Sequence, residues 1–256
     1  GTTAFANRVN LMQVTFSSST STSSISGSIG NNAFESCTKL TSINILSSIN
    51  SEPLTTPYDI GEHAFTHCTL LTSISIPAST NIGMNAFRWD GNNTILTSVT
   101  FNPDNSNSNS NIPTSIGENA FYSCQVLTSI IISVNVTSIG MNAFYDNNAL
   151  TDVIFDDLYN SKLESIGYRG FWHSSILEHI SIPPMVTSIG DYAFDYTNFT
   201  GSTEAYAHVN IDYLGHSGWA ASHPNTLMNP VGSSPAGVEG SFQNEGNFPV
   251  YGYKIF

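Results

Sequence analysis

The three cysteines carry the most reactive side chains of this chain: Cys37, Cys68 and Cys124. A cysteine nucleophile needs a base beside it, usually a histidine, and no histidine accompanies these cysteines at a fixed spacing. Each cysteine instead follows a phenylalanine by three residues, a position that elsewhere holds Asp90, Asn147, Ser174 and Thr197. Such small side chains can hydrogen-bond to backbone groups in a turn. We therefore predict buried structural thiols, with a Cys37–Cys68 disulfide and a reactive thiol as alternatives.

Histidine and aspartate side chains provide two weaker candidates for a metal site. His63 and His67 lie four residues apart, but the glutamate of a metalloprotease stands between its histidines, whereas Glu62 stands before them. Three aspartates lack the spacing and the glycine of an EF-hand: Asp152, Asp156 and Asp157. No phosphate-binding loop, serine-hydrolase motif or dinucleotide-binding motif occurs. The sequence predicts a protein that is not an enzyme, with no catalytic residue, no cofactor and no metal.

Composition restricts the partners that this chain can bind. Only 10% of its 256 residues are charged, against about 25% in a typical soluble domain. The formal net charge of −13, with six lysines and arginines, disfavours nucleic acid and anionic lipid, since both bind to clusters of basic residues. The apolar run at residues 129–134 is far shorter than the roughly 20 residues of a membrane span. We expect neither nucleic-acid binding nor membrane insertion. Sequons for N-glycosylation occur at Asn92, Asn135 and Asn198.

The chain repeats one phrase, written most fully as "IGEHAFTHCTLLTSISIP" at residues 60–77. A phenylalanine marks each copy: Phe5, Phe34, Phe65, Phe87, Phe121, Phe144, Phe171 and Phe194. The shortest spacings between them are 22 and 23 residues, and an isoleucine-glycine pair precedes most of them while a leucine follows. A period in this range indicates a solenoid, in which each unit buries its apolar side chains against its neighbours.

Each position of the phrase has a physical interpretation. The end of the phrase, "LTSIxI", alternates apolar and polar residues as a short strand with one buried face does, so stacked copies predict a parallel sheet. The glycine after the isoleucine suits a sharp turn because it tolerates a positive φ. The Ala-Phe pair suits a tight helical turn, in which the small alanine admits the next copy and the phenylalanine fills the interior. Gly170 replaces this alanine in one copy and keeps the position small.

The phrase "SIGxxAFxxCxxLTSIxIP" resembles the BspA-like leucine-rich repeat, a family of surface or secreted adhesion-type proteins. The resemblance covers about residues 4–199. It implies a right-handed repeat solenoid, mainly β, with repeats of about 22–23 residues, short parallel strands and tight helical turns. It carries over no catalytic residue. We expect a solenoid of about eight copies over residues 1–199, with the first and last copies incomplete, and a cap with an extended Gly-, Pro- and aromatic-rich arm over residues 200–256.

The outward positions of the predicted strands form two ladders across the sheet. The first ladder comprises Ser42, Ser73, Ser98, Ser129, Asp152 and His179, and the second comprises Asn44, Ser75, Thr100, Ile131, Ile154 and Ser181. Small polar residues fill the first copies, whereas later copies bring two isoleucines beside charged residues. The candidate binding residues, which resemble a small protein-docking patch, are Ile131, Asp152, Ile154, Glu178 and His179. The alternative is that the two isoleucines only pair well across neighbouring strands.

Four long linkers form a second candidate binding surface: residues 17–28, 46–59, 102–115 and 156–165. Each linker follows a predicted strand, so all four should leave the same edge of the parallel sheet. Loops gathered on one edge of a rigid scaffold are a common way to build a binding surface. The alternative is that this edge tolerates insertions, because the cost of closing a loop grows slowly with its length.

Repetition without a catalytic cluster predicts a non-enzymatic extracellular module for adhesion or for recognition of a protein or a cell surface. The expected partner is a protein or glycan on another cell or surface. The alternative is a structural subunit of a filament, surface layer or virion, which would bind copies of itself through its C-terminal arm. Binding of ice or of a polysaccharide by the hydroxyl ladder is a third hypothesis. We expect the protein to be extracellular or exposed on a surface.

Overall fold

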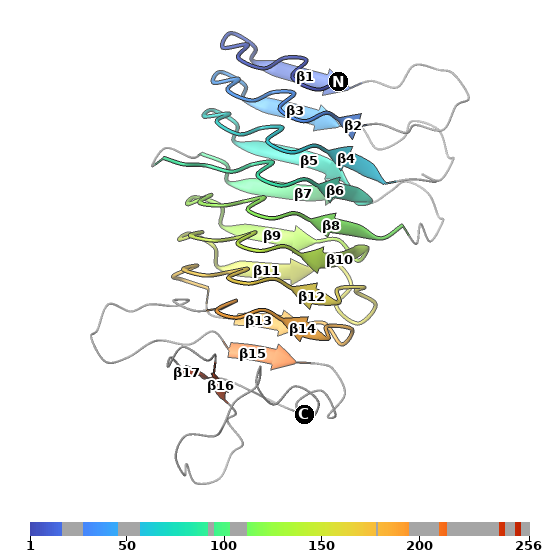
Figure 1. The fold of residues 1–256 in the computed structure, drawn as a ribbon, viewed down its shortest axis with the longest axis vertical. Coiled ribbons are helices and arrows are strands. Elements are labelled where there is room, and N and C mark those ends of the chain that lie inside the picture. The colour runs from blue at the N-terminus through green and yellow to red at the C-terminus, as the bar shows by residue number, and fades with distance from the viewer. Residues whose placement is uncertain are drawn as a thin grey trace.

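The computed structural model describes residues 1–16, 28–45, 57–91, 95–102, 112–177 and 179–194, and three short strands further on at residues 210–213, 241–243 and 249–251. In these residues the chain forms a column of stacked coils, each coil being one copy of the repeated phrase (Figure 1). The coils consist of strands and turns. The part of the chain that the structure describes contains no helix, and hence none that could cross a membrane. The prediction of a mainly β repeat solenoid is confirmed.

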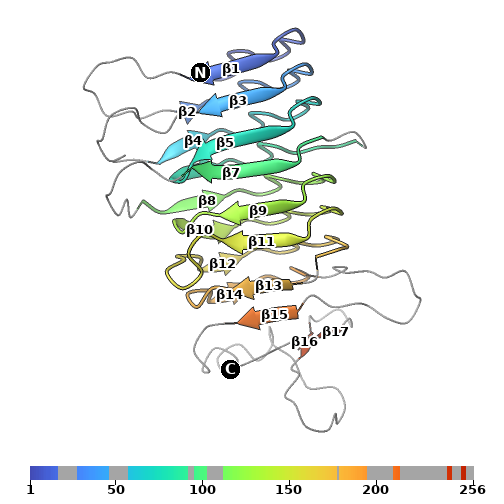
Figure 2. The same cartoon turned by 180° about the vertical axis from the view of Figure 1, so that it is seen from behind.

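Sheet 1 is the parallel sheet that the sequence predicts. Among the described residues it has eight strands: β1 (Gln13–Phe16), β3 (Ser42–Ile45), β5 (Ser73–Pro77), β7 (Ser98–Asn102), β9 (Ser129–Ile132), β11 (Asp152–Phe155), β13 (His179–Ile182) and β15 (Asn210–Tyr213). Figure 2 shows these strands side by side in chain order. Strand β15 lies within residues 200–256, for which the sequence predicts a cap. The domain boundary itself stays a prediction.

Sheet 2 has no counterpart in the sequence prediction. It runs alongside sheet 1 and has seven short parallel strands in the described part of the chain: β2 (Ser28–Ile29), β4 (Tyr58–Ile60), β6 (Thr80–Ile82), β8 (Thr114–Ile116), β10 (Val136–Ile139), β12 (Ser165–Ile166) and β14 (Ser188–Ile189). Each strand ends on the isoleucine of an Ile-Gly pair. Segments this short show no clear period in the sequence, so only the stacking of coils makes them strands. Two further strands, β16 (Ser241–Gln243) and β17 (Pro249–Tyr251), form an antiparallel pair.

The Ala-Phe segments form turns, not the predicted helical turns. Two residues in most of these turns have a left-handed backbone, as Asn119 does with a φ of 51° and Ser123 with a φ of 58°. Left-handed residues four positions apart interrupt a right-handed helix. Alternate backbone amides instead donate to carbonyls of the next coil, as those of Asn119, Phe121 and Ser123 do over 2.9, 2.8 and 2.7 Å. The turns are therefore hydrogen-bonded from coil to coil, as the strands are.

The glycine of each Ile-Gly pair is needed for a different reason from the predicted one. None of these glycines has a positive φ, so a sharp left-handed turn does not require them. A Cβ added at Gly140 would instead lie 2.7 Å from the amide nitrogen of Glu118 and from the carbonyl carbon of Gly117, both in the preceding coil. The same kind of backbone contact recurs at Gly61, Gly83, Gly117, Gly167 and Gly190. Glycine is required because neighbouring backbones approach one another too closely for a side chain.

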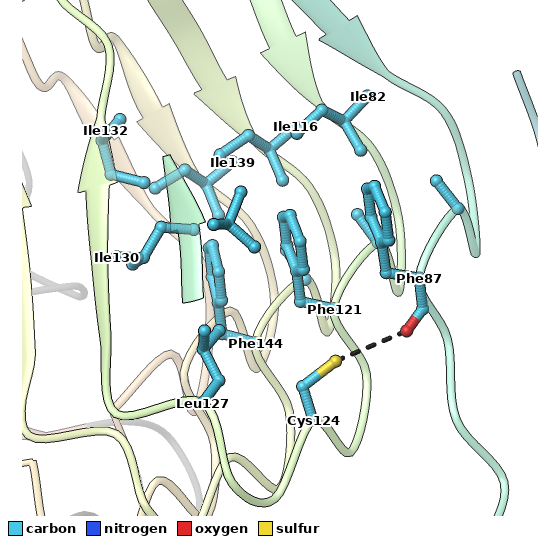
Figure 3. Close-up of a cluster of buried hydrophobic side chains, with 14 of the residues drawn as sticks. Ile82, Phe87, Ile116, Phe121, Cys124, Leu127, Ile130, Ile132, Ile139 and Phe144 are labelled. Carbon is cyan, nitrogen blue, oxygen red and sulfur yellow. Dashed lines mark hydrogen bonds between the residues drawn. The ribbon is translucent and has the colours of Figure 1, made fainter. Parts of the chain in front are cut away.

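The phenylalanines of the repeat stack into one column inside the solenoid. Consecutive ring centroids lie 5.0 to 5.4 Å apart, and consecutive ring planes are within 12° of parallel. Figure 3 shows part of this column, with Phe87, Phe121 and Phe144 beside isoleucines of sheet 2. The rings from Phe34 to Phe194 are all buried. The prediction that phenylalanine fills the interior is confirmed, and each ring depends on the coils above and below it.

Replacing Phe121 or Phe144 by alanine should lower the free energy of unfolding by about 3–5 kcal/mol, because each change leaves a cavity at a fully buried position. The two losses should be similar, since both rings occupy the same place in successive coils. Urea unfolding followed by circular dichroism measures the loss. Tyr159→Ala is the control, and it should change stability by at most about 0.5 kcal/mol because the side chain is 73% exposed. An unchanged stability in either phenylalanine variant would contradict the assigned repeat register.

Gly140→Ala should lower the free energy of unfolding by about 1–3 kcal/mol or more, because two coil backbones must separate to admit the methyl group. The matched control is Gly91→Ala, where the nearest atom to the added Cβ is Nε1 of Trp89 at 3.5 Å, an ordinary contact distance. The melting temperatures of the two variants give the comparison. Similar melting temperatures would show that close approach of the coils is not what selects glycine.

Candidate functional site

The three thiols bond to the backbone of the preceding coil. The Sγ atoms of Cys37, Cys68 and Cys124 donate to the carbonyl oxygens of Phe5, Phe34 and Phe87 over 3.0, 3.1 and 3.4 Å, and Figure 3 shows the last of these bonds. Asn147 and Ser174 occupy the same position in later coils and likewise donate to the phenylalanine carbonyl of the coil before. All three cysteines are free thiols, so the alternative of a Cys37–Cys68 disulfide is not the state observed. The prediction of structural thiols at this turn position is confirmed.

Burial makes these thiols poor nucleophiles. It raises the pKa of the Cys124 thiol to about 12, and it also raises the pKa of Cys37 and of Cys68. Because the thiolate is the reactive form, the folded protein holds almost none of it near neutral pH. These cysteines stabilise the turns and do not present a reaction centre.

The histidines that suggested a metal site are engaged with other groups. The ring of His63 lies 3.3 Å from the hydroxyl of Thr66 and 3.2 Å from the amide nitrogen of Asn85. The ring of His67 faces Asp90 at 3.9 Å. Within the described ranges, no group of three or more His, Cys, Asp or Glu side chains could hold a metal ion.

The outer face of sheet 1 carries both predicted ladders. Strand pairing aligns the first ladder across β3 to β13: Ser42, Ser73, Ser98, Ser129, Asp152 and His179. In the second ladder Asn44 pairs with Ser75 and Ser75 with Thr100, and Ile131 pairs with Ile154 further along. The alternation of apolar and polar residues therefore gave the correct register for these strands.

We call Ile131, Asp152 and Ile154 the sheet-face patch. Here apolar and charged side chains replace the small polar side chains that the earlier coils carry on the same face. Ile131 is 38% exposed and Ile154 is 49% exposed, although both belong to regular strands with buried neighbours. The carboxylate of Asp152 is exposed beside them and accepts a hydrogen bond of 2.6 Å from the Thr151 hydroxyl. His179 is placed only as a strand residue paired with Asp152, and Glu178 lies outside the described residues. Three of the five predicted residues therefore lie together on one surface.

One threonine per coil borders this face immediately before each strand: Thr41, Thr72, Thr97, Thr128 and Thr151. The hydroxyl of Thr97 donates to the carbonyl of Thr72 over 3.0 Å. The hydroxyl of Thr151 lies 3.0 Å from the carbonyl oxygen of Thr128, but its one hydrogen is shared with the nearer carboxylate of Asp152. Similar bonds of 2.9 and 3.4 Å join Thr41 and Thr72 to the coil before each. The hydroxyls of Thr41, Thr72 and Thr97 therefore join each coil to the one before it. Binding of ice or of a polysaccharide concerns the hydroxyl ladder on the face itself and stays a prediction.

Of the four long linkers, only residues 156–165 are described throughout. Asp157 accepts two hydrogen bonds from Asn160, which fixes the turn at the start of this linker. The other three linkers lie mainly outside the described residues. The strands that precede the four linkers are β1, β3, β7 and β11, and because sheet 1 is parallel these strands end on the same edge. The linkers as a binding surface stay a prediction.

The outer face of the turns carries an aromatic row that sequence reasoning missed. The residue after the core phenylalanine is aromatic in three successive coils: Tyr122, Tyr145 and Trp172. The first two rings stack with centroids 4.7 Å apart, and the second and third stack at 4.5 Å. The guanidinium of Arg88, at the same position one coil earlier, lies 4.8 Å from the ring centroid of Tyr122. Aromatic residues at one position of three consecutive copies were the sequence signal for this row.

The fold buries the asparagine of the sequon at Asn135. Asn135 is only 5% exposed, its amide nitrogen donates to the Ser79 hydroxyl, and its amide oxygen accepts a 2.6 Å hydrogen bond from Lys162. A glycan attached to this nitrogen would require the coil to open. Asn92 and Asn198 lie outside the described residues.

Comparison with known proteins finds the repeat throughout most of the chain. The family model of the BspA type leucine rich repeat region matches residues 1–112 and 94–215, with six copies of the repeat. None of the curated proteins matches the chain.

Solved structures similar to the chain come from bacterial leucine-rich repeat proteins. A leucine rich cell surface protein from Faecalibacterium prausnitzii is 20% identical, with 88% of this chain and 41% of that protein covered and a TM-score of 0.43. The T. pallidum leucine rich repeat protein is 21% identical, over 76% of this chain and 67% of that protein, with a TM-score of 0.45. The pneumococcal vaccine antigen PcpA is 18% identical, over 74% of this chain and 49% of that protein, with a TM-score of 0.36. The chain thus spans about two fifths of the length of the first of these proteins.

Thiol labelling should separate the folded from the unfolded protein. We expect a thiol reagent at pH 8 to modify none of the three cysteines in the folded chain within the time that suffices for complete modification in concentrated urea. Mass spectrometry counts the labels, and a peptide containing Cys124 serves as the unprotected control. Fast labelling of any cysteine in the folded protein would contradict the assignment of buried structural thiols.

The same thiols should make stability depend on pH at the alkaline end. The pKa of Cys124 rises from 9.0 to about 12 on folding, so its contribution to stability is complete below pH 9 and is lost as the pH rises toward 12. Cys124→Ser, which copies the serine that Ser174 supplies in a later coil, should remove that part of the pH dependence. Equal alkaline slopes of unfolding free energy in the two proteins would contradict this.

Proposed function

Because the chain belongs to the BspA-type leucine-rich repeat family, we propose that it is a non-enzymatic recognition module, exposed on a surface outside the cell, that binds another protein. The observation that carries this proposal is the sheet-face patch. Across β3, β5 and β7 the second ladder holds Asn44, Ser75 and Thr100, whereas across β9 and β11 it holds Ile131 and Ile154. The scaffold does not need these isoleucines, since small polar residues occupy the same position in other coils.

The patch has the composition of a small protein interface. Ile131 and Ile154 pair directly and offer adjoining apolar surface, while Ser129 and Asp152 border them with polar groups. An apolar centre with a polar rim is the usual form of such interfaces. Both isoleucines stand on strands hydrogen-bonded on both sides, so little backbone freedom is lost when a partner binds.

Other features support binding in preference to catalysis. The cysteines, which are the strongest nucleophiles of the chain, donate to backbone carbonyls and have raised pKa values. A protein partner is favoured over a nucleic acid because the net charge is −13. It is favoured over a glycan because two aliphatic side chains form the centre of the patch. The hypothesis of a structural subunit stays a prediction, since the C-terminal arm within residues 200–256 lies mostly outside the described residues.

The test is a pair of double variants measured against an array of extracellular and cell-surface proteins. The full chain should bind at least one protein of the array, and Ile131→Ser with Ile154→Ser should weaken that binding about tenfold or more, because the apolar centre is lost. The matched control is Ser75→Asn with Thr100→Asn, in the same ladder, where Asn44 shows that asparagine is tolerated. Circular dichroism and melting temperature should be unchanged in both.

Two outcomes would count against the proposal. Unchanged binding by a folded isoleucine variant would make this face only scaffold and would move attention to the linkers. Robust turnover in a panel of hydrolase and transferase assays would contradict a purely binding role.

A further inference from the structure

We propose that the outer face of the turns carries a second binding site, for a carboxylate side chain in an acidic segment of a partner protein, with Arg169 as its anchor. This site goes beyond the sheet-face patch. It consists of Arg169 and the aromatic row, Tyr122, Tyr145 and Trp172, which belongs to the turns and not to sheet 1.

Three aromatic rings lie close to the guanidinium of Arg169. Its guanidinium carbon lies 4.9 Å from the ring centroid of Tyr168, 5.5 Å from that of Trp172 and 5.6 Å from that of Tyr192. Its backbone is left-handed, with a φ of 53°, and its amide donates to the carbonyl of Asp191 in the next coil over 2.9 Å. The guanidinium is therefore placed before any partner arrives, which reduces the entropy lost on binding.

No carboxylate in the described part of the chain lies within ion-pair distance of Arg169, although the chain has 19 acidic residues and only six basic ones. Among the described residues, the buried Nε atom of Arg169 has no hydrogen-bond partner, and the residue as a whole is half-buried. We therefore assign contact with a ligand to the terminal nitrogens. A guanidinium presents these donors in a planar fork that matches the two oxygens of a carboxylate.

Two other charged side chains of the turn face are already matched by partners. Asp90 accepts a 2.7 Å hydrogen bond from Nε of Arg88. Asp146 lies 2.7 Å from Nδ1 of His173 and also accepts hydrogen bonds from Ser123, Gln125 and Asn148. Arg88 therefore has an acidic partner of its own, whereas the described residues place no carboxylate in ion-pair contact with Arg169.

The surroundings favour a protein segment as the source of the carboxylate. Tyrosine, tryptophan and arginine are the residues that contribute most to protein interfaces. One guanidinium among aromatic rings suits one carboxylate, whereas polyanions such as nucleic acids need many cations, and this chain has only six lysines and arginines. The earlier coils form an internal comparison, because Glu35 and Thr66 hold the position that Tyr122 and Tyr145 hold later, and these residues offer no ring to a ligand.

The experiment uses the full chain and a synthetic library of otherwise uncharged decapeptides. Each peptide carries one central aspartate or glutamate and has a matched copy with asparagine or glutamine. Some acidic peptides should bind about tenfold or more tightly than their amide copies, since a charged bidentate hydrogen bond is lost in the amide. Arg169→Gln should remove this preference, and Arg169→Lys, which keeps the charge without the fork, should restore only part of it.

Lys39→Gln is the matched control, because this exposed lysine lies several coils away from Arg169 and hydrogen-bonds to Asn10 of the coil before its own. The change should leave the preference unchanged. Thermal melting establishes whether each variant folds. If Arg169→Gln does not fold, Arg169→Lys provides the test. The proposal is overturned if no acidic peptide binds, or if the acid preference survives in a folded Arg169 variant. It is equally overturned if sialylated or uronate-containing oligosaccharides bind through Arg169 while the peptides do not.

Discussion

The stacking of each coil directly on the next is the constraint on which the rest of this structure depends. Backbone hydrogen bonds join successive coils in sheet 1, in sheet 2 and through the turns. The phenylalanine rings then lie 5.0 to 5.4 Å apart, which is close to the spacing of about 4.8 Å between neighbouring strands. Glycine is needed where backbones approach most closely, and a coil alone could not bury its own apolar residues.

Stacking also explains why the cysteines act as hydrogen-bond donors in the turns. A thiol, an amide and a hydroxyl take turns at one position, and each donates to the phenylalanine carbonyl of the coil before: Cys124, Asn147 and Ser174. Asp90 departs from this rule and turns outward to Arg88. The cysteines are thus interchangeable members of a polar row, and their chemistry as donors matters more than their chemistry as nucleophiles.

A repeat that restricts its inward positions to a few residue types leaves its outward positions freer to vary. Two departures from small polar residues fall in the same stretch of coils, although they lie on different elements. Ile131 and Ile154 stand on strands of sheet 1, while Tyr145 and Trp172 stand on the turns. Because one coil supplies a residue to each surface, the solenoid can present an apolar patch and an aromatic row without any change in its core.

The sequence by itself determined the repeat, the inward residues and the register of sheet 1. Fixed spacing of phenylalanine, leucine and isoleucine leaves one way to bury them, and period-two alternation then assigns Ile131 and Ile154 to the outer face. Only the tertiary structure decided the strands of sheet 2, the left-handed turns that replace helical ones, and the reason for Gly140. It alone also placed Arg169 among three rings of two coils. These features arise between coils, from how closely one backbone approaches the next, and a pattern read along one copy does not contain that distance.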